Sequence, residues 1–127
     1  MSIFNKLREL FYRRPKKLAS NSTRAERCQY GEDLAVDYSK LTLGFEVIAR
    51  NWRYKMYELA IVCLDAEVFV FVEVCARAAD ALVGGYHSID TLKKRVLQRG
   101  WRAYIYQLQN PPKHVRFDVI DISLSYE

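Results

Sequence analysis

The sequence predicts one α/β domain in which a mixed β-sheet lies between helices. The first observation is a hairpin pattern within Tyr57–Arg77, where two apolar and largely β-branched runs, Leu59–Leu64 and Val68–Val74, flank a short polar turn at residues 65–67. The second is the order of the predicted elements, which is helix, three strands, helix and strand. Three consecutive strands favour an antiparallel meander, and a strand that follows a helix can return parallel to a neighbour through a right-handed crossover. The sheet is therefore expected to be mixed.

Composition is consistent with a single domain in a reducing compartment. The chain has 127 residues, of which 50% are hydrophobic, and no apolar run is long enough to predict a membrane span. The N-terminus lacks the apolar region of a signal peptide, and the three cysteines are widely spaced and form no CxxC pair. A cytoplasmic location is expected, without a disulfide framework or a structural zinc site.

Positive charge is concentrated near the N-terminus. Residues 1–27 carry eight basic and two acidic side chains, whereas the rest of the chain carries twelve basic and thirteen acidic ones. Residues 3–14 show helical apolar spacing, and Pro15 ends the pattern. We expect a basic amphipathic helix and linker over residues 1–22, a domain over 23–124 and a tail over 125–127. The helix could lie on its own domain, on a membrane surface or on nucleic acid.

The domain is predicted to begin with a helix that runs from residue 24 to about Leu41. Thr23 is a suitable N-cap, with Glu26 as its capping-box partner, and Gly44 ends the helix. Gly31 costs about 1 kcal/mol of helix propensity relative to alanine and permits close approach of another backbone. The helix is expected to bury one face, formed by Leu34, Ala35, Tyr38 and Leu41.

Two further strands and a second helix complete the domain. Alternation predicts a first strand over Phe45–Tyr54 and a last strand over His114–Leu124, with a loop over residues 76–88. Ser88 is a suitable cap for a helix over Ile89–Leu108, which the following Asn-Pro-Pro ends. The helix is predicted to bury Ile89, Leu92, Val96, Tyr104 and Leu108 and to expose Lys93, Lys94, Arg95, Arg99 and Arg102.

Glu73 marks the place on the hairpin where chemistry is expected. It interrupts an apolar run, and a carboxylate is costly to bury without a partner. Because side chains alternate along a strand, Glu58 and Ala60 share one face of their strand, and Glu73 and Cys75 share one face of the next. Pairing in register would bring these two strand ends side by side.

Four short segments occur in a defined order, namely Gly31–Ala35, Val47–Arg53, Phe71–Arg77 and Arg116–Val119. Together they resemble the YraN-like family of uncharacterised bacterial proteins, over about residues 24–123. The resemblance implies a restriction-endonuclease-like fold, related to Holliday-junction resolvases, with a metal-dependent nuclease site of the PD-(D/E)XK type. In that chemistry, acidic side chains hold a divalent metal near the scissile phosphate, and a lysine positions or activates water.

The resemblance assigns roles to five positions. Glu32, Glu58 and Glu73 are the catalytic candidates, and Glu32 and Glu73 would hold Mg²⁺ or Mn²⁺ weakly. The family pattern has aspartate where this chain has Ala60, and lysine where it has Cys75. Ala60 offers no ligand, and an uncharged thiol is a poor partner for Mg²⁺. The cleavage site is therefore predicted to be degenerate, which leaves open whether the chain is an enzyme or a pseudoenzyme.

Basic residues around this site are candidates for contact with nucleic acid. A cationic face can follow a phosphate backbone, and a solvated helix face carries the same charges. Arg50 and Arg77 could instead form ion pairs with Glu73. The candidate set comprises Arg50, Arg53, Arg77, Lys93, Lys94, Arg95, Arg99 and Arg102.

The sequence supports three hypotheses about function. The first is a nucleic-acid-binding protein, with DNA favoured over RNA, that has a nuclease fold and a degenerate site. The second is a weak Mg²⁺- or Mn²⁺-dependent endonuclease that acts on branched or structured DNA. The third is a non-enzymatic protein-interaction or membrane-edge module that uses residues 1–18. Homodimerisation is compatible with each of them.

Overall fold

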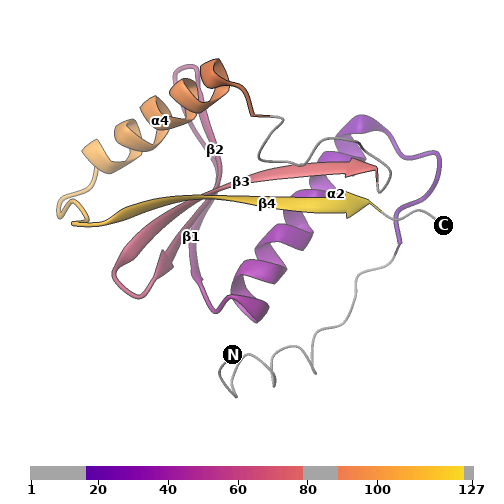
Figure 1. The fold of residues 1–127 in the computed structure, drawn as a ribbon, viewed down its shortest axis with the longest axis horizontal. Coiled ribbons are helices and arrows are strands. Elements are labelled where there is room, and N and C mark those ends of the chain that lie inside the picture. Colours follow the sequence, from indigo (N-terminus) through magenta and orange to yellow (C-terminus); the bar gives the residue numbers. More distant parts are fainter. Residues whose placement is uncertain (1–16, 79–88, 125–127) are drawn as a thin grey trace.

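The computed structural model describes residues 17–78 and 89–124. They form one four-stranded sheet in the order β1-β2-β3-β4, with a helix packed on each face (Figure 1). The predicted order of elements is confirmed. The strands are β1 (Glu46–Tyr54), β2 (Tyr57–Asp65), β3 (Val68–Ala78) and β4 (Val115–Leu124). The helices are α2 (Arg24–Asp37), its π-helical continuation η1 (Tyr38–Thr42) and α4 (Thr91–Tyr106).

The sheet is mixed, as predicted. β1 pairs antiparallel with β2, and β2 pairs antiparallel with β3 in the predicted hairpin. β4 pairs in parallel with β3, from Val115 opposite Phe69 to Leu124 opposite Ala78, and α4 lies on the crossover between them. β3 extends through residues 76–78, which were predicted to begin a loop. It continues there because its parallel partner, β4, pairs with it as far as Leu124.

Alternation along β3 divides the core between the two helices. Val70 and Val72 are buried against α2, where Ala35 is fully buried. Phe71 lies on the opposite face and meets Tyr104 of α4 edge to face, with ring centroids 5.9 Å apart. Burial on both faces explains why this strand is nearly continuous in hydrophobicity.

α2 begins at the predicted cap but buries a face different from the predicted one. Thr23 and Glu26 form the reciprocal capping box, in which the Thr23 N–H donates to the Glu26 carboxylate at 2.7 Å. At the other end, the buried Ser39 lies in a π-helical turn, whose wider winding gives a smaller rotation per residue and so changes the direction in which the following side chains point. Tyr38 and Leu41, predicted to be buried, are 44% and 40% exposed.

α4, unlike α2, begins later than predicted. Asp90 caps it by accepting a hydrogen bond from the Lys93 N–H at 2.7 Å, whereas the predicted cap, Ser88, lies outside the described residues. The buried side of the helix comprises Leu97, Gly100 and Tyr104. Leu92, predicted to be buried, is 71% exposed. It precedes Leu97 by five residues, which places it about 140° around the helix from the buried side.

The basic helix predicted over residues 3–14 and the predicted tail lie outside the described residues. The proposed domain boundaries therefore stay predictions, as does the role of residues 1–18 in binding a partner. Neither helix in the described ranges has the length and apolar character needed to cross a membrane.

Candidate functional site

The sheet forks beside Glu73. β2 and β3 pair with each other only over the five residues of each strand next to the hairpin turn. Beyond that point, the start of β2 stays paired with β1, while the end of β3 stays paired with β4 (Figure 1). We call this divergence the fork. Glu58 and Ala60 lie on one arm, and Glu73 and Cys75 lie on the other, so the predicted strand ends face an opening rather than a continuous ladder.

Glu73 is a partly buried carboxyl group among other charges. Its pKa is raised above the ordinary value, chiefly because burial disfavours the charged form. The Lys93 ammonium opposes this rise, and the carboxylates of Glu58 and Glu32 add to it. Within the described residues, the Glu73 side chain has no hydrogen-bond or ion-pair partner. The fork thus holds a carboxyl group that keeps its proton to higher pH than an exposed glutamate does.

A cavity of about 500 Å³ opens at the fork, and we call it the fork pocket. Three elements line it, with α2 on one side, β3 beneath and the start of α4 opposite. Of the predicted site residues, Glu32, Glu73 and Lys93 line it, whereas Glu58, Ala60 and Cys75 do not. The lining residues are Arg24, Arg27, Cys28 and Glu32 of α2, Glu73, Val74 and Ala76 of β3, and Lys93 of α4.

Gly31 allows α2 to approach β3 at this pocket. A Cβ atom at Gly31 would lie only 2.7 Å from the Cβ of Ala76. The close approach that this glycine predicted is therefore present, and its partner is a strand side chain. Because Glu32 follows Gly31 directly, the contact holds the Glu32 side chain beside the strand that carries Glu73.

The fork pocket contains two carboxylates that could serve a divalent metal ion, but it contains more cations than carboxylates. Its lining contains three cations and two carboxylates. Within residues 17–78 and 89–124, no group of three or more His, Cys, Asp or Glu side chains is placed to hold a metal ion. Mg²⁺ is usually bound by one or two carboxylates together with phosphate oxygens. The excess of cations therefore suits an anion better than a metal ion.

Ion pairs occupy three of the arginines predicted to contact nucleic acid. Since their guanidinium groups already have carboxylate partners, they are less available to a phosphate backbone. Neither Arg50 nor Arg77 pairs with Glu73, so that alternative role for Glu73 is wrong. The pairs are Arg50–Asp33 at 2.8 Å, Arg53–Glu58 at 3.3 Å and Arg77–Asp121 at 3.3 Å.

Three other predicted arginines lie along the exposed side of α4. Arg95, Arg99 and Arg102 follow one another at spacings of four and three residues, which places them in one row. They have no ion-pair partner within the described part of the chain. Leu92, 71% exposed, and Tyr106, 91% exposed, continue the row at its two ends. We call these five residues the α4 stripe.

Lys93 and Lys94 lie outside this row. Lys93 lines the fork pocket, and Lys94 lines a small cavity beside Trp101 and Phe117. The two lysines are adjacent in sequence and therefore leave the helix in different directions. The predicted cationic face of α4 is thus divided between the stripe and two separate cavities.

Sequence reasoning did not assign Arg24, Arg27 or Cys28 to the site. These residues precede Glu73 by 45 to 49 positions, and only the packing of α2 on β3 places them around the same pocket. Tyr106 of the α4 stripe was missed as well. Helical spacing from Arg99 and Arg102 would have placed Tyr106 in the same row.

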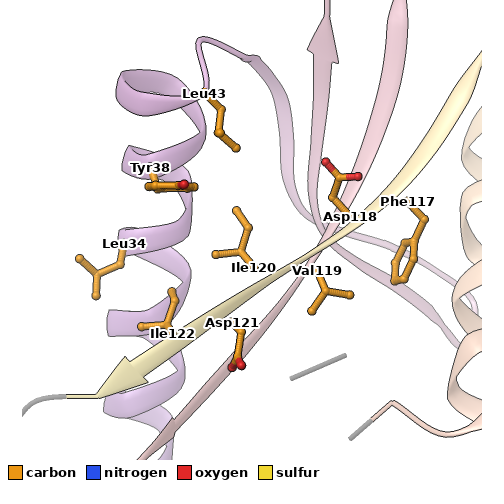
Figure 2. Close-up of a pocket in the computed structure, with 9 residues that line it drawn as sticks. All are labelled: Leu34, Tyr38, Leu43, Phe117, Asp118, Val119, Ile120, Asp121 and Ile122. Carbon is orange, nitrogen blue, oxygen red and sulfur yellow. The ribbon is translucent and has the colours of Figure 1, made fainter. Parts of the chain in front are cut away.

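A second, larger cavity of about 830 Å³ runs beside the outer edge of β4. Figure 2 shows Leu34, Tyr38 and Leu43 on the helical side and Ile120 and Ile122 of β4 facing them. β4 is an edge strand of the sheet, so no further strand covers these side chains in the described residues. None of the predicted site residues lines this groove.

Comparison with known proteins agrees with the resemblance seen in the sequence. The model of the uncharacterised protein family UPF0102 matches residues 31–122. This range includes the fork, with Glu32, Glu58 and Glu73, and all of α4. It excludes Arg24, Arg27 and Cys28 of the fork pocket.

Curated relatives cover most of the chain. A UPF0102 protein of Mycolicibacterium vanbaalenii is 35% identical over 107 residues, which are 84% of this chain and 88% of the relative. One from Nitratidesulfovibrio vulgaris is 36% identical over 75% of this chain and 70% of its own length. One from Dichelobacter nodosus is 37% identical, with coverage of 80% and 79%. With this coverage and the match of the family model, the chain belongs to the UPF0102 family of bacterial YraN-like proteins.

Proposed function

We propose that this protein binds nucleic acid, DNA in preference to RNA, on a restriction-endonuclease-like fold whose metal-dependent cleavage site is degenerate. The observation that carries the proposal is the α4 stripe, in which Arg95, Arg99 and Arg102 are exposed and lack ion-pair partners in the described residues. The forked mixed sheet between two helices supports the fold assignment.

The α4 stripe has the chemistry of a backbone-binding surface. Its three arginines span seven helical rises from Arg95 to Arg102, or about 10 Å. Double-stranded DNA carries one negative charge per about 1.7 Å of its axis, so a row of this length lies beside several phosphates. The exposed Tyr106 adds an aromatic face on which an unpaired base can stack. A row that served only solubility would not need an apolar or aromatic residue at each end.

The fork supports the degenerate part of the proposal. Ala60 and Cys75 stand where the family pattern has aspartate and lysine, and both lie on the arms of the fork. Without a ligand at Ala60 or a cation at Cys75, the remaining carboxylates lack the groups that would complete a cleavage site.

Binding is tested by charge reversal on the α4 stripe. Arg95→Glu/Arg99→Glu/Arg102→Glu is compared with Lys40→Glu/Lys55→Glu/Lys113→Glu, which changes the net charge equally at three exposed lysines elsewhere. Affinity for duplex and single-stranded DNA and RNA is measured by fluorescence anisotropy across a salt series. The stripe variant should lose affinity and lower the salt slope by about 2 to 3, since each lost phosphate contact contributes about 0.9. Equal losses in both variants would contradict a specific binding surface.

Degeneracy is tested by restoring the two missing groups. The natural chain and Ala60→Asp/Cys75→Lys are incubated with branched and linear DNA in the presence of Mg²⁺ or Mn²⁺. We expect cleavage by the double variant alone. Cleavage by the natural chain would show that the site is active as it stands, and failure of both proteins to cleave would argue against a nuclease ancestry of the fork.

A weak Mg²⁺- or Mn²⁺-dependent endonuclease is the second candidate. Its support is that Glu32 and Glu73 line the same pocket, so two carboxylates could share a metal ion with a substrate phosphate. In that case the natural chain would nick branched DNA, and Glu73→Gln would abolish nicking without weakening DNA binding in EDTA.

A further inference from the structure

We propose that the fork pocket binds a phosphate group through Arg24, Arg27 and Lys93, without a divalent cation. In the proposed function, on which this inference rests, the phosphate belongs to the nucleic acid that follows the α4 stripe. The inference differs from the family pattern in what holds the phosphate, since that pattern implies a metal ion beside it and here the side-chain cations would hold it alone.

The three cations come from two helices on opposite sides of the pocket. Arg24 and Arg27 are three residues apart on α2, which places them on one side of that helix, and Lys93 lies in the first turn of α4. Arg24 and Lys93 have no ion-pair partner within the described residues. Arg27 donates from Nη1 to the Ser22 carbonyl at 2.6 Å, which fixes the guanidinium and leaves its other donors for a ligand.

The charge balance of the pocket favours an anion. Three cations face two carboxylates, so the lining is positive even when both carboxylates are ionised. A phosphate group bound there would meet cations from both helices, whereas a metal ion would meet the same cations beside its ligands.

The pocket and the α4 stripe meet at the N-terminal end of α4. Lys93 lies in the same first turn of α4 as Leu92, where the stripe begins, but it points to the other side of the helix, about 200° of rotation from Arg95. A strand whose phosphates follow Arg95, Arg99 and Arg102 would therefore pass around this end of α4 to reach Lys93 and the mouth of the pocket. The stripe would supply affinity along the backbone, and the pocket would hold one phosphate in a defined place.

Cys28 provides a direct reporter of the pocket, because it lines the pocket and is exposed. The rate of its alkylation by iodoacetamide is followed by peptide mass spectrometry in EDTA. The probes are inorganic phosphate and a 5′-phosphorylated single-stranded oligonucleotide. Sodium chloride at equal ionic strength is the reference. We expect both phosphate probes to slow Cys28 alkylation severalfold relative to chloride.

Two matched double variants test whether the protection of Cys28 depends on the pocket cations or only on the total charge of the protein. Arg24→Gln/Lys93→Gln removes two pocket cations, and Lys40→Gln/Lys113→Gln removes two exposed cations elsewhere. The pocket variant should abolish protection of Cys28 and lower the salt slope of oligonucleotide binding by about 1 to 2. The control variant should retain the protection.

The outcomes distinguish this inference from the proposed function. Oligonucleotide binding that needs the α4 stripe but neither protects Cys28 nor responds to Arg24→Gln/Lys93→Gln would overturn the phosphate site alone. Protection by inorganic phosphate without oligonucleotide binding would support the phosphate site and overturn the proposed function. Protection that appears only after Mg²⁺ or Mn²⁺ is added would overturn the inference, because the pocket would then be a metal site.

Discussion

Replacing Gly31 with alanine is expected to destabilise the domain, although alanine is the better helix former. The new Cβ would lie 2.7 Å from the Cβ of Ala76, where two carbon atoms overlap. Both atoms are fixed to backbone, so neither can rotate away. Overpacking costs about 1–3 kcal/mol, and removing a glycine from a helix returns about 1 kcal/mol. The expected net change is a loss of up to about 2 kcal/mol of unfolding free energy.

Gly100 provides the matched control, since it is also a buried helical glycine. A Cβ there would lie 3.3 Å from the Cδ2 atom of Leu59, the end of a side chain that can move by a few tenths of an ångström. Gly100→Ala should therefore retain much of the gain of about 1 kcal/mol in helix propensity. The two substitutions are chemically identical, so a difference between them reports the space around each Cβ.

The assay is urea and thermal unfolding of Gly31→Ala, Gly100→Ala, Ala76→Gly and the double variant Gly31→Ala/Ala76→Gly. In a domain of this size, 1 kcal/mol corresponds to about 3–6 °C in Tm. The double-mutant cycle should give a favourable coupling of about 1–3 kcal/mol, because Ala76→Gly removes the atom that clashes. A coupling near zero, or equal stabilisation by Gly31→Ala and Gly100→Ala, would refute the close packing of α2 on β3.

Three further predictions concern titration and ion pairing. Because the pKa of Glu73 is raised in the folded state, this carboxyl group ionises first in the unfolded chain as pH rises, and the stability of the fold falls across the interval above the ordinary glutamate pKa. Glu73→Gln should therefore raise Tm at neutral pH and change it little at about pH 4. An equal change of Tm at both pH values would contradict this expectation. Arg116→Ala should cost less than about 1 kcal/mol in urea unfolding, since its pairs with Asp118 and Asp65 are partly exposed; a larger loss would assign the network a structural role. Burial raises the pKa of Cys63 to about 11, so iodoacetamide should label Cys28 in the native protein and reach Cys63 only after unfolding, as read by peptide mapping.

The architecture could be predicted because its signals are local. The hairpin has two apolar runs around a polar turn, and the parallel fourth strand follows from the intervening helix. The predicted burial of helix faces failed at the ends of the helices. Leu92 lies about 140° around α4 from the buried Leu97, and Tyr38 lies in a π-helical turn beside an uncovered edge strand. The π-helical turn and the uncovered edge are not visible in the spacing of the apolar residues.

The candidate site could be predicted only in part. Glu73 was found because a carboxylate interrupts an apolar strand, which is a local signal. The ion pairs that occupy Arg50 and Arg77 join residues 17 and 44 positions apart, and no local pattern shows them. The cations of the fork pocket depend on the packing of two helices against a divergent sheet, which the sequence does not determine at the level of single side chains.

The resemblance implies aspartate and lysine where this chain has Ala60 and Cys75, and the two departures together leave the net charge of the fork unchanged. Aspartate and lysine would contribute one negative and one positive charge, and Ala60 and Cys75 remove both. Of the three remaining glutamates, Glu58 is paired with Arg53 at 3.3 Å and does not line the pocket. The two that do line it are outnumbered by cations from the helices. The charge balance on which the proposed phosphate site rests therefore comes from Arg24, Arg27 and Lys93 of the helices and not from positions 60 and 75, which do not line the pocket.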